Sequence, residues 1–443
     1  MSLASPYLRA QSSELRTQNS ADLLRFSTAG SVDDGKSTLI GRLLYETKQI
    51  VDDQLEAVER ASRQQGADYL NLALLTDGLR AEREQGITID VAYRYFATPR
   101  RKFIIADTPG HVQYTRNMIT GASTSDLALI LVDARNGVVE QTRRHALLAT
   151  LLGVPRLVVC INKMDLVDYS EETFAGIRSE FEAFASRLNV EQIAYIPVSA
   201  LAGDNVAEPS ANMSWYGGPS LLRYLEEAPA GGRDRLGSLR FPVQYVVRPL
   251  SHEHHDYRGY AGQIAAGSVR PGDEVLVLPA GLTTRVASVD VFEDSLQEAS
   301  APLSVTLRLA DDLAVSRGDM ICSAYEPPTC TNALEATLCW LGTQPLRLDA
   351  PYLIQHSTRR VRAIVTALHH RLDPNTLDRD DTAGTLNLND IGCASLRITQ
   401  PLFVDSYDDC RATGSFILID AGTHDTVAGG IVAPFPRPLA GES

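Results

Sequence analysis

Long apolar runs are missing from this chain of 443 residues, and their absence narrows the kinds of protein it can be. The first 20 residues carry Arg9, Glu14 and Arg16 and contain no apolar stretch as long as a signal peptide or a membrane span. We therefore expect a cytoplasmic protein without membrane association, in which residues 1–20 form a flexible N-terminal tail.

Cysteine is also scarce, and acidic residues outnumber basic ones. The six cysteines include no CxxC pair, and a chain of this length needs no disulfide framework, so we expect reduced thiols. The formal net charge is -14, which gives the molecule no overall positive field to attract a polyanion. We therefore expect no nucleic-acid partner, unless a local basic patch serves one.

Residues 21–235 alternate short apolar runs with helical stretches, a pattern typical of a parallel α/β sheet. The apolar runs are LLRFSTAG, RKFIIADTPG, DLALILVDA, RLVVCINKMD and IAYIPVSA. Several are apolar at consecutive positions, as expected for strands that helices cover on both faces. Residues 46–85 interrupt this order with apolar residues at helical spacing among many charges, which predicts a helical insertion.

The second half of the chain has a different pattern. A segment rich in Gly, Pro and charge around residues 228–239 marks a boundary, and the apolar runs after it are short and β-like. Turn residues separate these runs, which favours antiparallel barrels. The sequence therefore predicts an α/β domain with a mostly parallel sheet, followed by two antiparallel β-barrel domains at residues 240–328 and 332–437.

The first chemical motif is GSVDDGKS at residues 30–37, which fits GxxxxGK[ST] between an apolar strand and a helical stretch. Glycines let backbone N–H groups approach phosphate oxygens, Lys36 can reach the β and γ phosphates, and the Ser37 hydroxyl can bind Mg²⁺. The motif therefore predicts a P-loop. We expect nucleotide contacts from Gly30, Ser31, Val32, Asp33, Asp34, Gly35, Lys36, Ser37 and Thr38.

The second motif, DTPGH at residues 107–111, follows the strand RKFIIA. There the Asp107 carboxylate can organise Mg²⁺ through water, and Gly110 can bond the γ phosphate. His111 could face the attacking water, although an isolated loop histidine is usually structural. Thr88 in GITID can add its hydroxyl to Mg²⁺, which would link a loop to the nucleotide state. We expect catalytic roles for His111, Lys36 and Thr88.

The third motif is NKMD at residues 162–165. Asp165 can accept two hydrogen bonds from guanine N1–H and the 2-amino group, and adenine would leave this carboxylate unpaired. The sequence thus favours GTP over ATP. Asn162 can bond the imidazole side of the base, and the Lys163 stem can cover its face. Residues 199–201 (Ser199, Ala200, Leu201) can offer a backbone N–H to guanine O6.

A group of His252, His254, His255 and Asp256 could in principle bind a metal. It lies in a polar run, so we interpret it as a solvated loop. The cysteines Cys322, Cys330 and Cys339 lack zinc-ligand spacing, and we expect ordinary thiols there.

With these motifs the chain resembles translational GTPases, such as elongation factor Tu and elongation factor 1 alpha, over essentially its full length. Residues 103–174, 241–250 and 258–275 look more specifically like the GTPase (large) subunit of bacterial sulfate adenylyltransferase. GSVDDGKST is also similar to that subfamily, in which Asp34 stands where translation factors commonly have His. The insertion is similar to that of elongation factor 1 alpha, which keeps a translation role open.

The resemblance implies a heterodimer. This subunit would bind and hydrolyse GTP with Mg²⁺, while a smaller catalytic subunit joins ATP and sulfate into adenylyl sulfate and pyrophosphate. Because that synthesis is uphill, the family couples it to GTP hydrolysis, and switch loops near Thr88 and His111 would transmit the nucleotide state. By the same resemblance, Val32 and Ile87 would form an apolar gate beside His111, the alternative being plain loop packing.

Two other functions remain open from the sequence. One is a translation factor that delivers aminoacyl-tRNA, and the other is a nucleotide-dependent binding module without turnover. Some relatives also carry a fused adenylyl-sulfate kinase with its own P-loop, and no second GxxxxGK[ST] follows Gly41. The sequence leaves open whether the chain is a stand-alone subunit or part of a longer protein.

Overall fold

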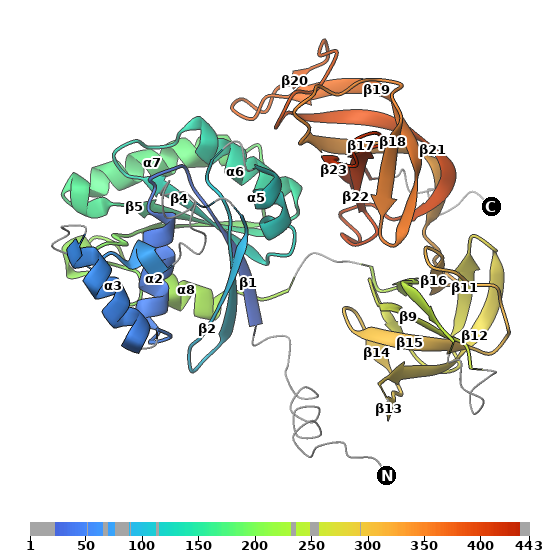
Figure 1. Ribbon diagram of the computed structural model, residues 1–443. Coiled ribbons are helices and arrows are strands. Elements are labelled where there is room, and N and C mark those ends of the chain that lie inside the picture. The colour runs from blue at the N-terminus through green and yellow to red at the C-terminus, as the bar shows by residue number, and fades with distance from the viewer. Residues whose placement is uncertain are drawn as a thin grey trace. The chain divides into compact units, whose positions relative to one another are not determined.

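A computed structural model describes residues 23–50, 52–64, 70–75, 88, 90–111, 115–231, 236–248, 257–292 and 294–434. The predicted N-terminal tail, residues 1–20, lies outside these ranges. The chain divides into two compact units (Figure 1): residues 1–232 with 374–376, and residues 233–373 with 377–443.

A six-stranded sheet forms the centre of the first unit, in the order β2-β3-β1-β4-β5-β6. Five strands run parallel, and β2 pairs antiparallel with β3 at one edge. The strands are β1 (Leu23–Ala29), β2 (Ala92–Ala97), β3 (Lys102–Asp107), β4 (Leu127–Asp133), β5 (Arg156–Asn162) and β6 (Gln192–Pro197). Strand β1 lies between β3 and β4, so the strand order reverses at β1. Such a reversal opens a crevice at the carboxyl end of the strand, where α/β sheets commonly bind ligands.

Helices surround this sheet in the chain order. They are α2 (Lys36–Glu46), α3 (Asp52–Gln64), α5 (Thr115–Ala122), α6 (Glu140–Leu151), α7 (Glu171–Ala185) and α8 (Leu221–Glu227), with short 3-10 turns η2 (Leu72–Leu75), η4 (Met164–Val167) and η5 (Ala211–Met213). Helix α3 contacts the short turn η2. Every residue of β4 is buried, so both of its faces are covered, as the consecutive apolar sequence predicts. One face shares a core with α2 and α8, and α6 also packs against β4.

Aromatic packing fixes the edge of the sheet. Phe96 and Phe103 stack at 4.4 Å between ring centroids, and each meets Phe26 edge to face at 6.4 Å. These rings come from β2, β3 and β1, so one apolar cluster joins the antiparallel edge strand to the parallel strands. Within the predicted insertion, α3 covers residues 52–64 and buries Val58.

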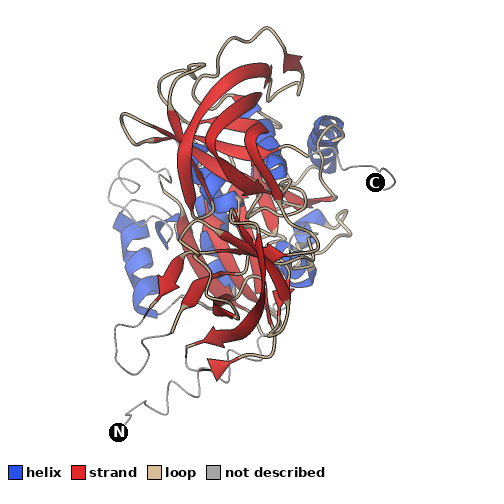
Figure 2. Cartoon of the chain, turned by 90° about the vertical axis from the view of Figure 1, so that its right-hand side faces the viewer, coloured by secondary structure: helices blue, strands red, loops and turns tan. Residues whose placement is uncertain are grey.

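The described residues of the second unit form strands and loops (Figure 2). Its first barrel contains β7 (Arg240–Pro242), β8 (Tyr245–Val247), β9 (Gly259–Gln263), β10 (Ser268–Val269), β11 (Glu274–Leu278), β12 (Leu282–Val291), β13 (Asp294–Ser295), β14 (Ala299–Ser300), β15 (Ser304–Leu309) and β16 (Met320–Ser323). A bridge between Arg240 in β7 and Ala266 links one end strand of its main sheet to the segment that follows β9. All strand pairings within it are antiparallel.

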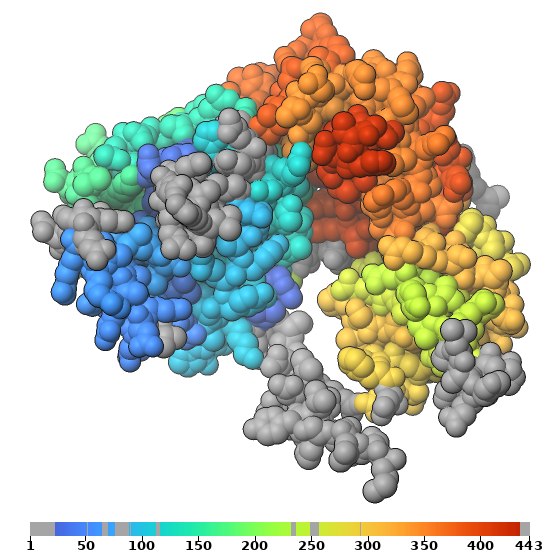
Figure 3. Space-filling model, in the orientation of Figure 1, coloured from blue at the N-terminus to red at the C-terminus, as the bar shows by residue number. Residues whose placement is uncertain are grey.

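The second barrel contains β17 (Thr329–Trp340), β18 (Tyr352–His356), β19 (Arg359–Leu372), β20 (Arg379–Asp380), β21 (Ile391–Val404), β22 (Ser415–Asp420) and β23 (Thr426–Val432). It is closed, because β18 pairs with both β22 and β19. Figure 3 shows the two barrels, yellow-green and orange-red, in direct contact, and a shared apolar cluster contains Met320 from one and Phe403 from the other. The predicted fold class is confirmed.

Candidate nucleotide-binding site

The loop between β1 and α2 turns through two left-handed residues, Asp33 (φ 70°) and Gly35 (φ 88°). A side chain at Gly35 would also clash with its neighbours, because a Cβ there would lie 2.4 Å from the side-chain nitrogen Nδ2 of Asn162. Any larger residue is excluded on both grounds. The loop therefore leads directly into the amino terminus of α2, which favours bound anions.

Asp34 stabilises this loop from within. The Ser31 backbone N–H donates to Asp34 Oδ2 at 2.6 Å, and the Asp34 N–H donates to the Ser31 carbonyl at 3.2 Å. Burial raises the pKa of the Asp34 carboxyl to about 6, although the hydrogen bond from Ser31 lowers it. The nearby Asp133 and Asp33 charges raise this pKa further, and Lys163 lowers it.

Lys36 joins the P-loop to two other predicted motifs. Its Nζ lies 2.5 Å from Asp107 Oδ1 at the end of β3 and 2.6 Å from the Thr88 hydroxyl. All three side chains are buried, with Lys36 at 7% exposure and Asp107 at 1%. A buried ammonium needs such partners, since an unpaired charge would be strongly penalised. The structure thus brings the three residues predicted for the phosphate and metal side to one point.

Gly110 lies against the P-loop, where a Cβ on it would come within 2.2 Å of the Gly30 carbonyl oxygen. The Gly110 carbonyl accepts a hydrogen bond from Gln141 Nε2 at 3.3 Å, and the same nitrogen lies 2.8 Å from His145 Nε2. Burial lowers the pKa of His145 to about 3, so this imidazole is neutral and its Nε2 can accept from Gln141. A pair of residues on α6 therefore holds the glycine predicted to contact the γ phosphate.

Asn162 links the P-loop to the residues after β6. Its Nδ2 donates to the Asp34 carbonyl at 2.7 Å, and its Oδ1 accepts from the Ala200 N–H at 3.0 Å. The sequence predicts that Asn162 bonds the base and that residues 199–201 offer a backbone N–H to guanine O6. In the structure, the Ala200 N–H is bonded to Asn162. Because β5 and β6 are adjacent and parallel, their carboxyl ends bring these residues together.

Lys163, next along the motif, has φ 64° and extends to Asp133 at the end of β4, with Nζ 2.9 Å from Oδ2. Arg135 binds the same carboxylate through two nitrogens, at 3.0 and 2.6 Å. Burial would raise the pKa of Asp133, but the hydrogen bonds from Arg135 and Lys163 outweigh it and lower the pKa to about 2. The Lys163 stem is thus held in place. Asp165 is partly exposed in η4, and its carboxylate takes no hydrogen bond from the described residues.

The remaining predicted residues are placed as follows. Ser37 and Thr38 are half-buried in the first turn of α2, Val32 is 42% exposed, and Ser199 is buried beside the 41% exposed Leu201. His111 directly follows Gly110 and is half-buried. Ile87 of the predicted gate, and the group of His252, His254, His255 and Asp256, lie outside the described residues.

The oxygen atoms at this site suit a hydrated Mg²⁺ ion and a phosphate chain. Hydroxyl and carboxylate oxygens from Thr88 and Asp107 already converge on one cation, the Lys36 ammonium. Among the described residues the buried hydroxyls of Thr28 and Ser31 have no hydrogen-bond partner, which is unusual for buried polar atoms, and Ser31 belongs to the P-loop itself. Mg²⁺ prefers such oxygen ligands together with phosphates and water.

Four residues with clear structural roles were not predicted from the sequence: Asp133, Arg135, Gln141 and His145. Asp133 carried a usable signal, because it ends an apolar strand of the parallel sheet, as Asp107 and Asn162 do. Gln141 and His145 are spaced i and i+4 on a helix, which predicts that they meet but not what they contact.

The fold and this site define a GTP-binding protein of the translation-factor type. Residues 21–239 match the family described as Elongation factor Tu GTP binding domain, and residues 333–433 match GTP-eEF1A C-terminal domain-like. The chain therefore carries a GTPase domain. Two structures of sup35, complexed with GDP and with GMPPNP, align with TM-scores of 0.42 at 27% and 26% identity, covering 94% and 98% of this chain and 95% and 99% of theirs.

Curated relatives give a more specific assignment. "Sulfate adenylyltransferase subunit 1" from Methylorubrum populi is 52% identical over 97% of this chain and 92% of its own, and that from Alteromonas mediterranea is 49% identical over 95% and 88%. The "Bifunctional enzyme CysN/CysC" of Mycobacterium tuberculosis is 56% identical over 93% of this chain and 67% of its own length. The chain belongs to the sulfate adenylyltransferase subunit 1 family.

Proposed function

We propose that this protein is the GTP-hydrolysing, energy-coupling subunit of a sulfate adenylyltransferase. A smaller catalytic subunit, bound as a heterodimer, would convert ATP and sulfate to adenylyl sulfate and pyrophosphate. The observation that carries the coupling part is the meeting of Lys36, Thr88 and Asp107 at one point. These residues come from three separate segments, so a ligand that binds one of them changes the surroundings of the other two.

The phosphate side of the reaction would use this group of residues. When Mg²⁺ is bound, it neutralises charge on the β and γ phosphates, and Ser37, Thr88 and Asp107 (through water) would hold it. The Lys36 ammonium would leave Asp107 and pair with phosphate oxygens, while Gly110 donates its backbone N–H to the γ phosphate. His111, next to Gly110, would orient the attacking water, with Val32 and Ile87 as its apolar neighbours.

Base recognition would use the opposite end of the site. The Asp165 carboxylate is free to accept from guanine N1–H and the 2-amino group, and the Lys163 stem, fixed by Asp133, would cover the base. Asn162 and Ala200 would hold the surrounding loops, and a remaining backbone N–H of residues 199–201 would serve O6. Gly30 to Thr38 would surround the phosphates.

We further propose domain limits of 21–235 for the GTPase domain with its insertion at 46–85, and 240–328 and 332–437 for the two barrels. A cytoplasmic location fits the six free thiols. Within the described residues, no helix combines the length and apolarity that a bilayer crossing demands.

The test is to co-express the chain with a sulfate adenylyltransferase small subunit, purify the complex and assay adenylyl sulfate with and without GTP. We expect co-purification and GTP-stimulated synthesis. His111→Ala should keep the complex and GDP binding but lose both GTP hydrolysis and the stimulation, which separates hydrolysis from assembly.

A translation role is the competing function, and the same preparation tests it. Ribosomes with charged tRNA, added in place of the small subunit, should leave GTP turnover unchanged. Stimulation by ribosomes and not by the small subunit would contradict the proposal. Nucleotide binding without turnover under any of these conditions would indicate a binding module instead.

A further inference from the structure

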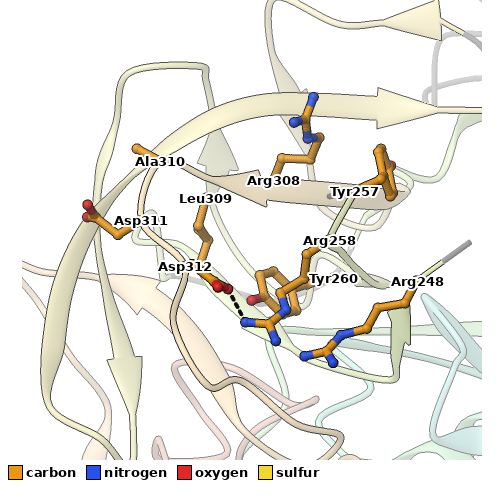
Figure 4. A pocket seen from close by; sticks show the side chains of 9 residues that line it. All are labelled: Arg248, Tyr257, Arg258, Tyr260, Arg308, Leu309, Ala310, Asp311 and Asp312. Carbon is orange, nitrogen blue, oxygen red and sulfur yellow. Dashed lines mark hydrogen bonds and ion pairs between the residues drawn. The ribbon is translucent and has the colours of Figure 1, made fainter. Parts of the chain in front are cut away.

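A second concave site lies in the first barrel of the second unit. It is a cavity of about 440 Å³ beside β9 and the end of β15, and no residue of the nucleotide motifs lines it. Figure 4 shows its lining residues, which are Arg248, Tyr257, Arg258, Tyr260, Arg308, Leu309, Ala310, Asp311 and Asp312.

Some of the charged side chains in this cavity have partners of opposite charge among the described residues, and others do not. Arg258 Nη1 donates to Asp312 Oδ1 and, at 2.9 Å, to the Leu313 carbonyl. Asp311 is also engaged, because its Oδ2 accepts from the Thr284 hydroxyl at 2.7 Å. Within the described part of the chain, Arg248 and Arg308 have no carboxylate partner. As far as the described residues go, Arg248 and Arg308 therefore lack a neutralising carboxylate, in a protein whose net charge is -14.

The cavity has two chemically different ends. In Figure 4 the guanidinium groups of Arg248 and Arg258 point toward one another beside Tyr260. Asp312 already pairs with Arg258, so the Arg248 guanidinium carries the uncompensated charge at this end, and an oxyanion that both groups contact would compensate it. At the other end the Arg308 guanidinium lies over the Tyr257 ring, 5.2 Å from its centroid, so a planar cation and a ring form a surface for stacking.

The walls are held in position before any ligand arrives. Tyr260 is 1% exposed, and its hydroxyl donates to the Leu313 carbonyl at 3.0 Å, the same oxygen that Arg258 binds. A cavity of this size is in the range of small-molecule sites and exceeds the needs of one tetrahedral ion. The acidic charge of the chain also disfavours a long polyanion such as a nucleic acid.

We propose that this cavity binds a small phosphate or sulfate ester of nucleotide size. Its oxyanion contacts Arg248 and Arg258, and its planar ring lies against Arg308 and Tyr257. This inference is independent of GTP hydrolysis and of the small subunit, because every residue it uses belongs to the first barrel.

The test uses the full chain saturated with GDP and Mg²⁺, so that the P-loop is filled, and titrates adenosine 5′-monophosphate by calorimetry. We expect binding that falls about tenfold or more when adenosine or inorganic phosphate replaces the nucleotide, since each lacks one of the two contacts. A comparison of p-nitrophenyl phosphate with p-nitrophenyl sulfate decides which oxyanion the site prefers.

Two exposed arginines allow substitutions that leave the barrel folded. Arg248→Ala should weaken nucleotide binding about tenfold, and Arg308→Lys, which keeps the charge but loses the planar group, about threefold to tenfold. The matched control is Arg285→Ala, which removes an exposed arginine from the same barrel outside the cavity and should leave affinity unchanged. Absence of any binding signal, an equal loss in the control, or tighter binding of an oligoadenylate than of the mononucleotide would overturn the proposal.

Discussion

Each unit of the protein contains a buried ion pair, and the two pairs are built differently. In the second unit, Arg240 is 1% exposed and binds Asp405 through two nitrogens, both at 2.9 Å. Arg240 also donates to the carbonyls of Leu239 and Glu326, and Asp405 accepts from Thr413. In the first unit, the Lys36 ammonium contacts Asp107 and Thr88 and no other side chain among the described residues.

This difference separates a permanent contact from an exchangeable one. The Arg240 guanidinium is fixed by planar, two-point bonding and by backbone carbonyls that no ligand would replace. The Lys36 ammonium is a point charge whose partners are oxygen atoms, and phosphate oxygens can replace them without loss. The same kind of interaction therefore stabilises the barrels in one unit and prepares a ligand site in the other.

The largest expected effect is on the permanent pair. Arg240→Ala leaves the Asp405 carboxylate without its main partner, so the free energy of unfolding should fall by about 3–5 kcal/mol. Denaturant unfolding of the GDP-bound protein measures this loss, and GDP affinity at 25 °C should be unchanged. Arg317→Ala, an exposed arginine of the same barrel, is the control and should cost less than about 1 kcal/mol.

The P-loop carboxyl Asp34 gives the next largest effect, and it depends on pH. The pKa of Asp34 is about 6 in the folded protein, against an ordinary value of 3.8. Between about pH 4 and pH 6 the folded protein therefore keeps a proton on this carboxyl that the unfolded chain has released. The stability that Asp34 contributes is complete below pH 4 and is lost as pH rises through 6.

The substitution Asp34→Asn replaces the titrating carboxyl by a neutral amide, so no negative charge forms there close to Asp33, Asp133 and Lys163. The variant should match the wild type near pH 4 and exceed it by about 2–3 kcal/mol at pH 7, measured by unfolding of nucleotide-free protein. A constant difference between the two proteins across this pH range would contradict the role given to Asp34.

Breaking the Lys36–Asp107 pair should lower the free energy of unfolding mainly when no nucleotide is bound. In nucleotide-free protein, Asp107→Asn leaves the Lys36 ammonium poorly compensated and should lower stability by about 2 kcal/mol. With saturating GDP the phosphates supply the missing negative charge, and the loss should shrink to less than about 1 kcal/mol. The same loss with and without GDP would show that the Lys36–Asp107 contact is as permanent as that of Arg240.

The smallest effect concerns the contact between α6 and Gly110. Gln141→Leu removes the donor to the Gly110 carbonyl, whose bond at 3.3 Å is long, so GTP turnover should fall by less than about tenfold while GDP affinity is retained. Single-turnover hydrolysis measures the rate. Gln54→Leu on α3 is the matched control and should not change it.

The sequence predicts the fold and the strand, loop and helix of the P-loop because local patterns encode them. The strand, glycine loop and helix around Lys36 are contiguous, and Gly35 is required by a positive φ that the motif itself implies. The apolar run of β4 predicts a strand buried on both faces. These features need no knowledge of which strand lies beside which.

The features that the sequence does not predict depend on strand order. Asn162 bonds Asp34 and Ala200 because β5 and β6 are neighbours in the sheet, and Lys163 reaches Asp133 because β4 lies on the other side of β5. The antiparallel direction of β2 depends on its pairing with β3. Each is a contact between segments far apart in the chain, whose register only the fold specifies.

The most direct test of the account is nucleotide competition by calorimetry on the wild type and Asp165→Asn. The wild type should bind GDP at least about a thousandfold more tightly than ADP, because only guanine satisfies the Asp165 carboxylate, and the variant should lose most of this preference. Equal affinity of the wild type for the two nucleotides, or an unchanged preference in Asp165→Asn, would contradict it.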